Sequence, residues 1–245
     1  MIKIAIIGYG KMGKEIHNLS AAYNCEVTHI FDIDNPVSEE QNYEFDVAVD
    51  FSFPDAVIEN CRIISNLKKN LVIGTTGWYN DMEKIKELTN KNNTGTIWGS
   101  NFSTGMNVMF KISEYAAKLF DKLENYDVFM HEFHHRNKKD SPSGTAIQLA
   151  NILLNNISRK NHIESDRSSD IIAKDSLHVT STRGGSIPGT HTIYFDSPED
   201  TIEIKHTARS RTALAAGALM AVGMIHQQKG FYEFSEKLNE LWNSL

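Results

Sequence analysis

A short run near the middle of the chain carries the side chains best suited to proton transfer. Residues 132–145 read EFHHRNKKDSPSGT, and positions 134–139 hold two imidazoles, a guanidinium and two ammonium groups. Histidine titrates near neutral pH, so His134 or His135 could act as general acid or base. The chain has a formal net charge of −6, so this basic run would give an anionic substrate a local attraction.

The residues that follow predict a helix whose first turn binds an anion. We expect Ser141 to cap this helix and Pro142 to lie in its first turn. The backbone N–H groups of Ser143, Gly144 and Thr145 would then be unpaired and would face a substrate carboxylate. A solvated basic loop followed by an ordinary capped helix is the alternative. We favour a binding site because histidines, cations and helix start coincide.

The histidines also raise the question of a metal site made by His131, His134 and His135. On a strand, His131 and His135 would share one face while His134 would point to the other. No thiol or carboxylate lies at a ligand-like spacing from them. We therefore expect no metal.

A glycine-rich motif near the N-terminus predicts a dinucleotide site. The motif consists of Gly8, Tyr9, Gly10, Lys11, Met12 and Gly13. It follows a strand-like run at 2–7 and opens a helical pattern, so its N–H groups could face a pyrophosphate. Asp32 ends the next strand, about 20 residues after the third glycine. A carboxylate at this position can accept hydrogen bonds from the hydroxyl groups of an adenosine ribose. The alternative is a tight turn with an incidental surface aspartate.

Two later segments lie at the expected carboxyl ends of parallel strands, where ligands bind. They consist of Gly74, Thr75 and Thr76, and of Gly99, Ser100, Asn101 and Phe102. Small residues in the first segment would leave room for a nicotinamide ring. Ordinary turns at strand ends explain both segments equally well.

The elements that must position these residues change character near residue 104. Before it, strand-like runs at 2–7, 26–32, 45–52, 70–77 and 95–100 alternate with helical patterns, which is typical of a parallel sheet. After it come helices at 104–123 and 141–156, a strand at 126–135, and strands at 177–185, 189–196 and 201–208 that we expect to be antiparallel. Helices at 211–227 and 232–241 end the chain.

The expected fold class is therefore α/β, with two domains. A Rossmann-type parallel-sheet domain comprises residues 1–103 and 213–245, because the final helices have the amphipathic character that its sheet needs. An α+β domain with a mostly antiparallel sheet comprises residues 104–212 and serves substrate binding and oligomerisation.

The composition and charge of the chain limit the classes of partner that it can bind. An acidic chain repels phosphate backbones and anionic lipid, so we expect neither nucleic acid nor membrane as a partner. The most apolar late segment, 213–225, is too short to span a bilayer, and the N-terminus lacks a secretory signal. The two cysteines, Cys25 and Cys61, suit buried thiols in a cytoplasmic protein.

Taken together, these segments resemble the 4-hydroxy-tetrahydrodipicolinate (dihydrodipicolinate) reductase family of lysine and diaminopimelate synthesis. The segment EFHHRNKKDSPSGTA is similar to the family signature E-x-H-H-x-x-K-x-D-x-P-S-G-T-A. Further segments similar to the family occur in the family's order: GYGKMG, DFSFP, GTTG, SNFSTGMN, RGGSIPGTH and IEIKHTARSR.

The resemblance implies an oxidoreductase that uses NADH or NADPH to reduce an anionic cyclic dicarboxylate, and a homotetramer assembled through the sheet of the second domain. It implies that His134 is the acid/base and Lys138 the proton donor. It also implies that His135 contacts the substrate and that Gly144 and Thr145 bind its carboxylate. The cofactor contacts would be GYGKMG, Asp32, Gly74–Thr76 and Gly99–Phe102.

The chain departs from the family pattern at Asn137, where many members carry another histidine, and its glycine loop lacks the extra residue that some members have. Ile33 follows Asp32 where some members have an arginine for the NADP phosphate, so we expect NADH to be used at least as well as NADPH. Another amino-acid dehydrogenase and a non-catalytic NAD(H)-sensing module remain alternatives. A semialdehyde dehydrogenase would need a nucleophilic cysteine, and the sensor would not need the basic run.

Overall fold

The computed structural model describes residues 1–165 and 170–243, which form two compact units. Unit 1 comprises Met1–Ser103 and Arg211–Leu245, and unit 2 comprises Thr104–Ser210. Part of the polar stretch after the helix at 141–156 and the last two residues of the expected first domain lie outside the described residues. Each unit is considered by itself.

Unit 1 is built on a parallel sheet whose six strands, among the described residues, run in the order β11-β5-β4-β3-β1-β2. The strands are β1 (Ile2–Ile7), β2 (Cys25–Phe31), β3 (Val47–Asp50), β4 (Asn70–Ile73), β5 (Gly95–Trp98) and β11 (Gly230–Glu233). Strand order reverses between β1 and β3, which places a topological switch point at the end of β1. Ligands bind at such points in open α/β sheets.

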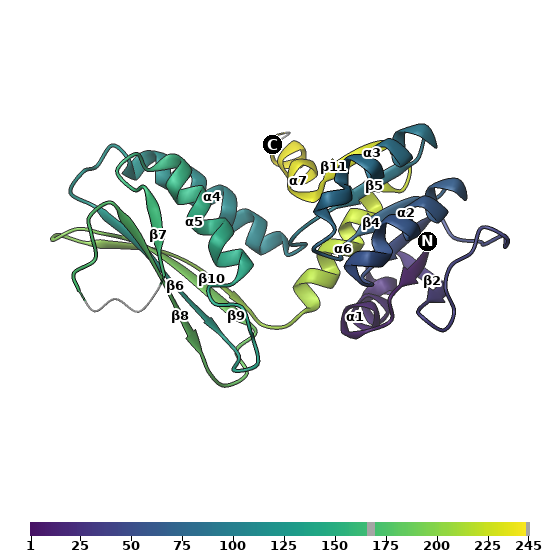
Figure 1. The fold of residues 1–245 in the computed structure, drawn as a ribbon, viewed down its shortest axis with the longest axis horizontal. Helices are drawn as coiled ribbons and strands as arrows, with labels where there is room; N and C mark the ends of the chain where they lie inside the picture. The colour runs from purple at the N-terminus through teal and green to yellow at the C-terminus, as the bar shows by residue number, and fades with distance from the viewer. Residues whose placement is uncertain (166–169, 244–245) are drawn as a thin grey trace. The chain divides into compact units, whose positions relative to one another are not determined.

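Helices cover both faces of this sheet (Figure 1). They are α1 (Lys11–Leu19), α2 (Pro54–Asn66), α3 (Met82–Lys91), α6 (Thr212–Ile225) and α7 (Phe234–Asn243), with short 3₁₀ turns at Ser20–Tyr23 and Tyr79–Asp81. Because strand side chains alternate, Ile4 and Ile6 pack toward α1, α6 and α7, whereas Ala5 and Ile7 pack toward α2 and α3. The result is a three-layer α/β/α unit.

Helix α6 returns the chain to unit 1, and its small residues allow it to pack closely against the rest of that unit. A side chain at Gly217 would place its Cβ 1.6 Å from the carbonyl oxygen of Phe102, so only glycine fits there. Ala218, Leu219 and Val222 of the same helix are buried in the core beside the strands. None of the helices in the described part of the chain is long and apolar enough to cross a membrane.

The end of the chain differs from the expected helix at 232–241. Residues Gly230–Glu233 form the edge strand β11, which pairs in parallel with β5, and α7 begins only at Phe234. A short aromatic run such as GFYE has no periodicity that separates a strand from a helix, so its strand partner decides its conformation.

Unit 2 is a five-stranded sheet, within the described residues, with two helices on one face (Figure 1). Its elements are α4 (Thr104–Phe120), β6 (Asp127–His134), α5 (Gly144–Asn156), β7 (His162–Glu164), β8 (Ser176–Arg183), β9 (Gly189–Asp196) and β10 (Thr201–Ala208). Val128 and Met130 of β6 pack beneath α4 and α5 with Ile193 and Phe195 of β9. By alternation, Glu132 and His134 point to this same helix-covered face.

The sheet of unit 2 is mixed, with strand order β10-β9-β6-β8-β7. Strand β9 is antiparallel to β6 and β10, but β8 is parallel to β6 and to β7. The expectation that the strands at 177–185 and 189–196 pair with each other was wrong, because β6 lies between them. Strand β7 lies in the polar stretch and was not expected at all, since its three residues carry no alternation.

Candidate active site

The glycine motif in unit 1 forms the turn between β1 and α1, and each glycine has a different role. Gly8 has φ +90°, and a Cβ there would lie 2.5 Å from the carbonyl oxygen of Phe51. A Cβ at Gly13 would lie 2.3 Å from the carbonyl oxygen of Gly8. Gly10 has open space where a side chain would be. This matches a loop that turns tightly, packs closely and leaves its middle glycine open to a ligand.

A pocket of about 440 Å³ opens beside this loop. It is lined by Gly10, Lys11, Met12, Phe51, Ser52, Pro54, Gly74, Thr75 and Thr76. The structure thus brings the glycine motif and the segment after β4 together, at the carboxyl ends of β1, β3 and β4. A volume of this size is typical of small-molecule and cofactor sites.

The small residues after β4 serve the pocket in a different way from the one expected. A Cβ at Gly74 would lie 2.1 Å from the ring of Phe51, so the space at Gly74 belongs to this ring and is not left for a nicotinamide. The hydroxyl of Thr75 donates to Asp50 (2.9 Å). Thr76 is exposed at the pocket wall.

Asp50 is a buried carboxylate that the sequence analysis missed. It is 0% exposed and accepts from the backbone N–H of Ser52 (2.8 Å), the Ser52 hydroxyl (2.6 Å), the Asn60 amide (2.8 Å) and Thr75. These bonds tie together the loops after β3 and β4, both of which line the pocket. The segment DFSFP contains it, but nothing in that segment alone predicts burial of the aspartate.

Asp32 follows β2 directly and lies in a tight turn. Its Oδ1 accepts from the backbone N–H groups of Asp34 (3.1 Å) and Asn35 (3.0 Å), which fix the carboxylate. The N–H of Gly8 donates to the carbonyl of Phe31 (2.8 Å), so this turn is adjacent to the glycine loop.

The segment Gly99–Phe102 takes a more structural place than expected. Phe102 is 2% exposed and packs against Phe234 with ring centroids 4.8 Å apart. A Cβ at Gly99 would lie 3.2 Å from the ring of Phe102 and 3.2 Å from Cβ of Phe234. Ser100 is exposed, and Asn101 accepts from the N–H of Ser103 (2.9 Å). The Phe102 side chain therefore belongs to the core of unit 1.

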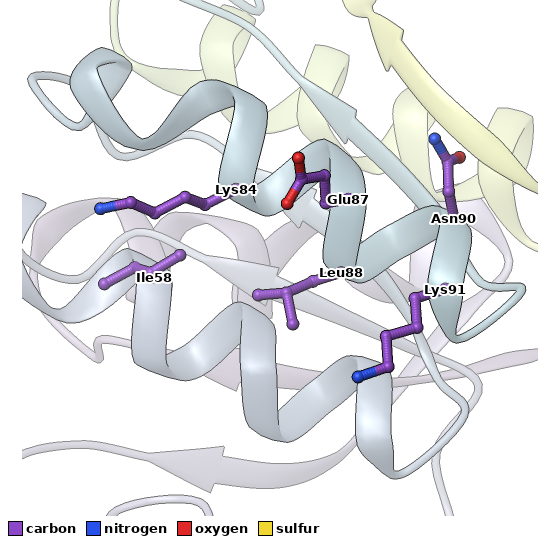
Figure 2. A pocket seen from close by; sticks show the side chains of 6 residues that line it. All are labelled: Ile58, Lys84, Glu87, Leu88, Asn90 and Lys91. Carbon is purple, nitrogen blue, oxygen red and sulfur yellow. The ribbon is translucent and has the colours of Figure 1, made fainter.

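A second hollow of unit 1 lies on the outside, between α2 and α3 (Figure 2). Ile58 and Leu88 lie between the two helices, while Lys84, Glu87, Asn90 and Lys91 surround them. It holds neither the glycine loop nor the ends of the parallel strands, so it is a gap between surface helices.

In unit 2 the expected anion-binding helix begins later than expected. Ser143, and not Ser141, caps α5: its hydroxyl accepts from the N–H of Ala146 (3.1 Å), and Pro142 lies outside the helix. The N–H of Ser143 is not unpaired but donates to Glu132 (2.9 Å). Ser143 therefore caps the helix with its hydroxyl and is also held by Glu132, a residue of strand β6. A capping rule that considers only neighbouring residues does not predict this second contact.

The centre of this site is the carboxylate of Glu132, which is 0% exposed. Its Oε1 accepts from the N–H of Ser143 (2.9 Å), the hydroxyl of Ser181 (2.8 Å) and Nη2 of Arg183 (2.7 Å). Its Oε2 accepts from the hydroxyl of Ser143 and lies 3.4 Å from Nε2 of His191. One carboxylate thus joins β6, β8, β9 and the start of α5.

Burial by itself would raise the pKa of Glu132, because a charge is costly in the interior. The partners outweigh that cost: His191, Ser143, Arg183 and Ser181 hold the pKa of this carboxyl well below its usual range. Glu132 is therefore a permanent anion at the base of the site.

His134 ends β6 and is 7% exposed. Its Nδ1 lies 3.2 Å from Oε2 of Glu132, and its ring centroid lies 5.2 Å from that of His191. Burial lowers the pKa of His134 to about 4; Glu132 opposes this shift, while His191, Lys138 and Arg183 add to it. The imidazole is consequently neutral at pH 7.

The loop after β6 carries the remaining expected residues. Nζ of Lys138 pairs with Asp140 (2.9 Å), and the N–H of Lys138 donates to the carbonyl of His135 (3.1 Å). The Lys138 ammonium and the N–H of Gly144 help to lower the pKa of the Asp140 carboxyl. Arg183 donates to the carbonyl of Asp140 (2.6 Å) and so anchors the loop to β8.

Arg183 and His191 complete the cluster around Glu132, and the sequence predicted them only as parts of the strands at 177–185 and 189–196. They reach Glu132 only because β8 and β9 flank β6. The expected metal alternative used His131, which lies on the opposite face of β6 and contacts Thr180. Among the described residues, Glu132, His134 and His191 do lie at ligand-like distances. The carboxylate of Glu132, however, already accepts hydrogen bonds from the guanidinium of Arg183 and from Ser143 and Ser181, so its oxygens are occupied.

The parallel sheet, glycine loop and pocket, together with a second unit that carries the buried cluster of Glu132, His134 and His191, are typical of an NAD(P)H-dependent oxidoreductase of the Rossmann type. Comparison with known families is more specific. A model of the N-terminus of dihydrodipicolinate reductase matches residues 2–102, and a model of its C-terminus matches residues 105–238. The chain belongs to the dihydrodipicolinate reductase family.

Individual relatives agree over nearly the whole chain. The chain is 35% identical over 243 residues to the 4-hydroxy-tetrahydrodipicolinate reductase of Christiangramia forsetii, covering 99% of this chain and 100% of the relative. It is 36% identical over 241 residues to that of Thermosipho africanus, covering 98% and 99%. A dipicolinate-bound dihydrodipicolinate reductase from Paenisporosarcina sp. TG-14 shares the fold, with a TM-score of 0.77, 24% identity and coverage of 96% and 99%.

Proposed function

We propose that this enzyme reduces 4-hydroxy-tetrahydrodipicolinate to tetrahydrodipicolinate with NADH or NADPH, in the diaminopimelate route to lysine. The observation that carries the proposal is the cluster around Glu132, which places a neutral imidazole beside the start of α5 and near the Lys138 ammonium. A cyclic dicarboxylate needs such a combination of anion binding and proton transfer, and the family match covers both units.

The pocket of unit 1 fits a dinucleotide. The open position at Gly10 allows a pyrophosphate to approach the backbone at the start of α1, and Lys11 adds a cation there. Asp32 would accept a hydrogen bond from the adenosine ribose, and Gly8, Tyr9, Met12 and Gly13 form the loop. Thr75 and Thr76, the backbone of Gly74, and Gly99–Asn101 would lie at the nicotinamide end. When bound, the reduced nicotinamide supplies the hydride.

The substrate carboxylate is assigned to the first turn of α5. The N–H groups of Gly144 and Thr145 lie in the first turn of a 13-residue helix, where an anion is favoured, and the N–H of Gly144 already acts on the carboxylate of Asp140. His135 would contact the same substrate from the loop. Ser143 has both its N–H and its hydroxyl bonded to Glu132, so we assign it to holding this turn and not to contacting the substrate.

Proton transfer is assigned to Lys138 and His134. The 4-hydroxyl group must leave as water, which gives a C=C–C=N system in the ring. Hydride addition to the terminal carbon of this system leaves negative charge that a proton must neutralise at the adjacent carbon, and the Lys138 ammonium can donate that proton. The neutral His134 can take up a proton once the substrate's negative charge lies beside it. An imidazole next to an anionic group binds its proton more tightly.

The direct test is consumption of NADH or NADPH with freshly condensed aspartate semialdehyde and pyruvate, followed by the loss of reduced-nicotinamide absorbance. Turnover with this mixture supports the proposal. Turnover only with another amino or hydroxy acid would indicate a different dehydrogenase. Binding of NADH without any turnover would indicate an NAD(H)-sensing module.

We also propose that the chain forms a homotetramer through the open face of the sheet of unit 2. The face away from α4 and α5 carries Phe129 stacked on Tyr194 (5.0 Å) and His131 against Phe133, which is 39% exposed. An exposed aromatic sheet face can pack against the same face of a second copy of the chain.

Light scattering of the purified chain should give four times the monomer mass, and Phe133→Asp should reduce this mass. Tyr115→Ser, at an exposed tyrosine of α4, is the matched control. A monomeric wild-type chain would contradict the proposal.

The cytoplasm is the compartment we propose for this enzyme. Cys25 and Cys61 are both free and buried, and burial raises the pKa of the Cys61 thiol to about 12, so this thiol is unreactive. Fractionation of cells that express the chain, with a cytoplasmic marker as reference, tests this.

A further inference from the structure

The buried carboxylate of Glu132 is the charged group that the proposed proton chemistry leaves without a role. It is 0% exposed, and five side-chain or backbone groups converge on it. Burying a carboxylate is costly unless every lone pair is used, so such a group is expected to do more than fill space.

The ring of His134 is held between Glu132 and the backbone of Gly189. Nδ1 lies 3.2 Å from Oε2 of Glu132, and it has no aligned hydrogen-bond partner among the described residues. A lone pair on Nδ1 would face a permanent anion, whereas a proton there would be attracted to it. Catalytic hydrogen bonds are often long or misaligned before ligand binds, so a small ring rotation would complete this one.

The other nitrogen of the ring faces the space that Gly189 leaves open. A Cβ at Gly189 would lie 2.9 Å from Nε2 of His134 and 3.3 Å from Cδ2. The missing side chain therefore leaves room for the ring of His134 at Nε2, which a Cβ would crowd. With the proton on Nδ1, the lone pair of Nε2 is the one available for proton transfer.

Resting on the proposed function, we propose that Glu132 is a positioning residue that fixes His134 as the Nδ1–H tautomer and simultaneously holds the anion-binding turn of α5. The second part follows from the bonds of Ser143, whose N–H and hydroxyl both donate to this carboxylate. Arg183 extends the same anchor to the carbonyl of Asp140. One side chain thereby couples the orientation of the acid/base to the geometry of the carboxylate site.

The variant that tests this is Glu132→Gln, which keeps the shape but replaces one oxygen by an amide donor. A donor facing Nδ1 favours the opposite tautomer, with the proton on Nε2. In the serine-protease triad, replacing the carboxylate behind the histidine by an amide lowers kcat about 10⁴-fold through the wrong tautomer. Here we expect a fall in kcat of about 10²-fold or more and a higher substrate KM, with the Kd of NADH unchanged.

The decisive readout is the tautomer itself, measured by ¹⁵N NMR of histidine-labelled protein, with the His134 signal assigned through His134→Gln. We expect Nδ1–H in the wild-type chain and Nε2–H, or a mixture, in Glu132→Gln. This measurement does not depend on turnover. If the wild-type chain failed to turn over the substrate, the proposed function would fall, and the tautomer would still decide the role of Glu132.

Lys160→Met is the matched control for simple damage to the fold. Lys160 is another buried charge of unit 2; its Nζ donates to the carbonyls of Lys174 (2.9 Å) and Ser176 (2.7 Å) and pairs with Asp127. Asp127 begins the strand that His134 ends, about 23 Å away at ~3.3 Å per residue. We expect Lys160→Met to lower Tm while keeping kcat. The same tautomer in wild type and Glu132→Gln, or an equal loss of kcat in both variants, would overturn the inference.

Discussion

Binding of a dianionic ligand should draw a proton onto His134. Burial lowers the pKa of this imidazole to about 4, so at pH 6 only about 1% of it is protonated in the free enzyme. The difference from the ordinary value of about 6.5 is about 2.5 units, or about 3 kcal/mol disfavouring the charged form. Two ligand carboxylates beside the ring would offset part or all of this cost.

If the ligand restores the pKa of His134 to about 6.5, about three quarters of the imidazole is protonated at pH 6 in the complex. Titration calorimetry with dipicolinate, repeated at pH 6 in two buffers of different ionisation enthalpy, should then show uptake of up to about 0.75 proton. Uptake should fall to about 0.25 proton at pH 7 and toward zero above it, because neither state then holds the proton. His134→Gln is the control and should remove most of the uptake. Zero uptake in the wild type, or the same uptake in His134→Gln, would refute the reasoning.

Three further predictions concern the two units separately. His134→Gln and Lys138→Ala should each lower kcat by about 10²–10⁴-fold while the Kd of NADH changes little. A near-normal kcat in both variants would show that the basic residues only bind the anionic substrate and that the proton comes from water. Gly10→Ala should weaken NADH binding and leave Tm nearly unchanged, because a Cβ there meets no protein atom. Gly8→Ala should lower Tm, because Gly8 has φ +90° and its Cβ would lie 2.5 Å from the carbonyl oxygen of Phe51. Equal Tm values for the two variants would contradict this prediction. The kcat/KM for NADH should at least equal that for NADPH because Asp32 disfavours a 2′-phosphate; a tenfold preference for NADPH, about 1.4 kcal/mol, would show that a cation such as Lys11 dominates.

Much of unit 1 is predictable from the sequence because its signals are local. A β-branched run, three glycines and an aspartate specify a strand, a turn and a helix start within the first 32 residues. The structure adds what spacing does not contain: the ring of Phe51 fills the space at Gly74, and Asp50 becomes a buried anchor.

The site in unit 2 is less predictable because its partners are distant in sequence. The basic run with His134 and Lys138 is contiguous and was found, but Ser181, Arg183 and His191 approach Glu132 only through strand pairing. The same pairing is why the strands at 177–185 and 189–196 do not pair with each other as expected. No periodicity tells which strand inserts between two others.

The pairing around Glu132 also bears on how the sheet of unit 2 selects its alignment during folding. Ser181 and His191 are the residues directly opposite Glu132 on the two neighbouring strands. A slip of β8 by one residue would turn Ser181 and Arg183 to the opposite face and leave the buried carboxylate without two of its donors. An uncompensated buried charge costs about 3–5 kcal/mol, a large part of the stability of a small domain. The charge that prepares the site for chemistry thus also penalises misregistered sheets, so the strand register and the competence of the site are selected together.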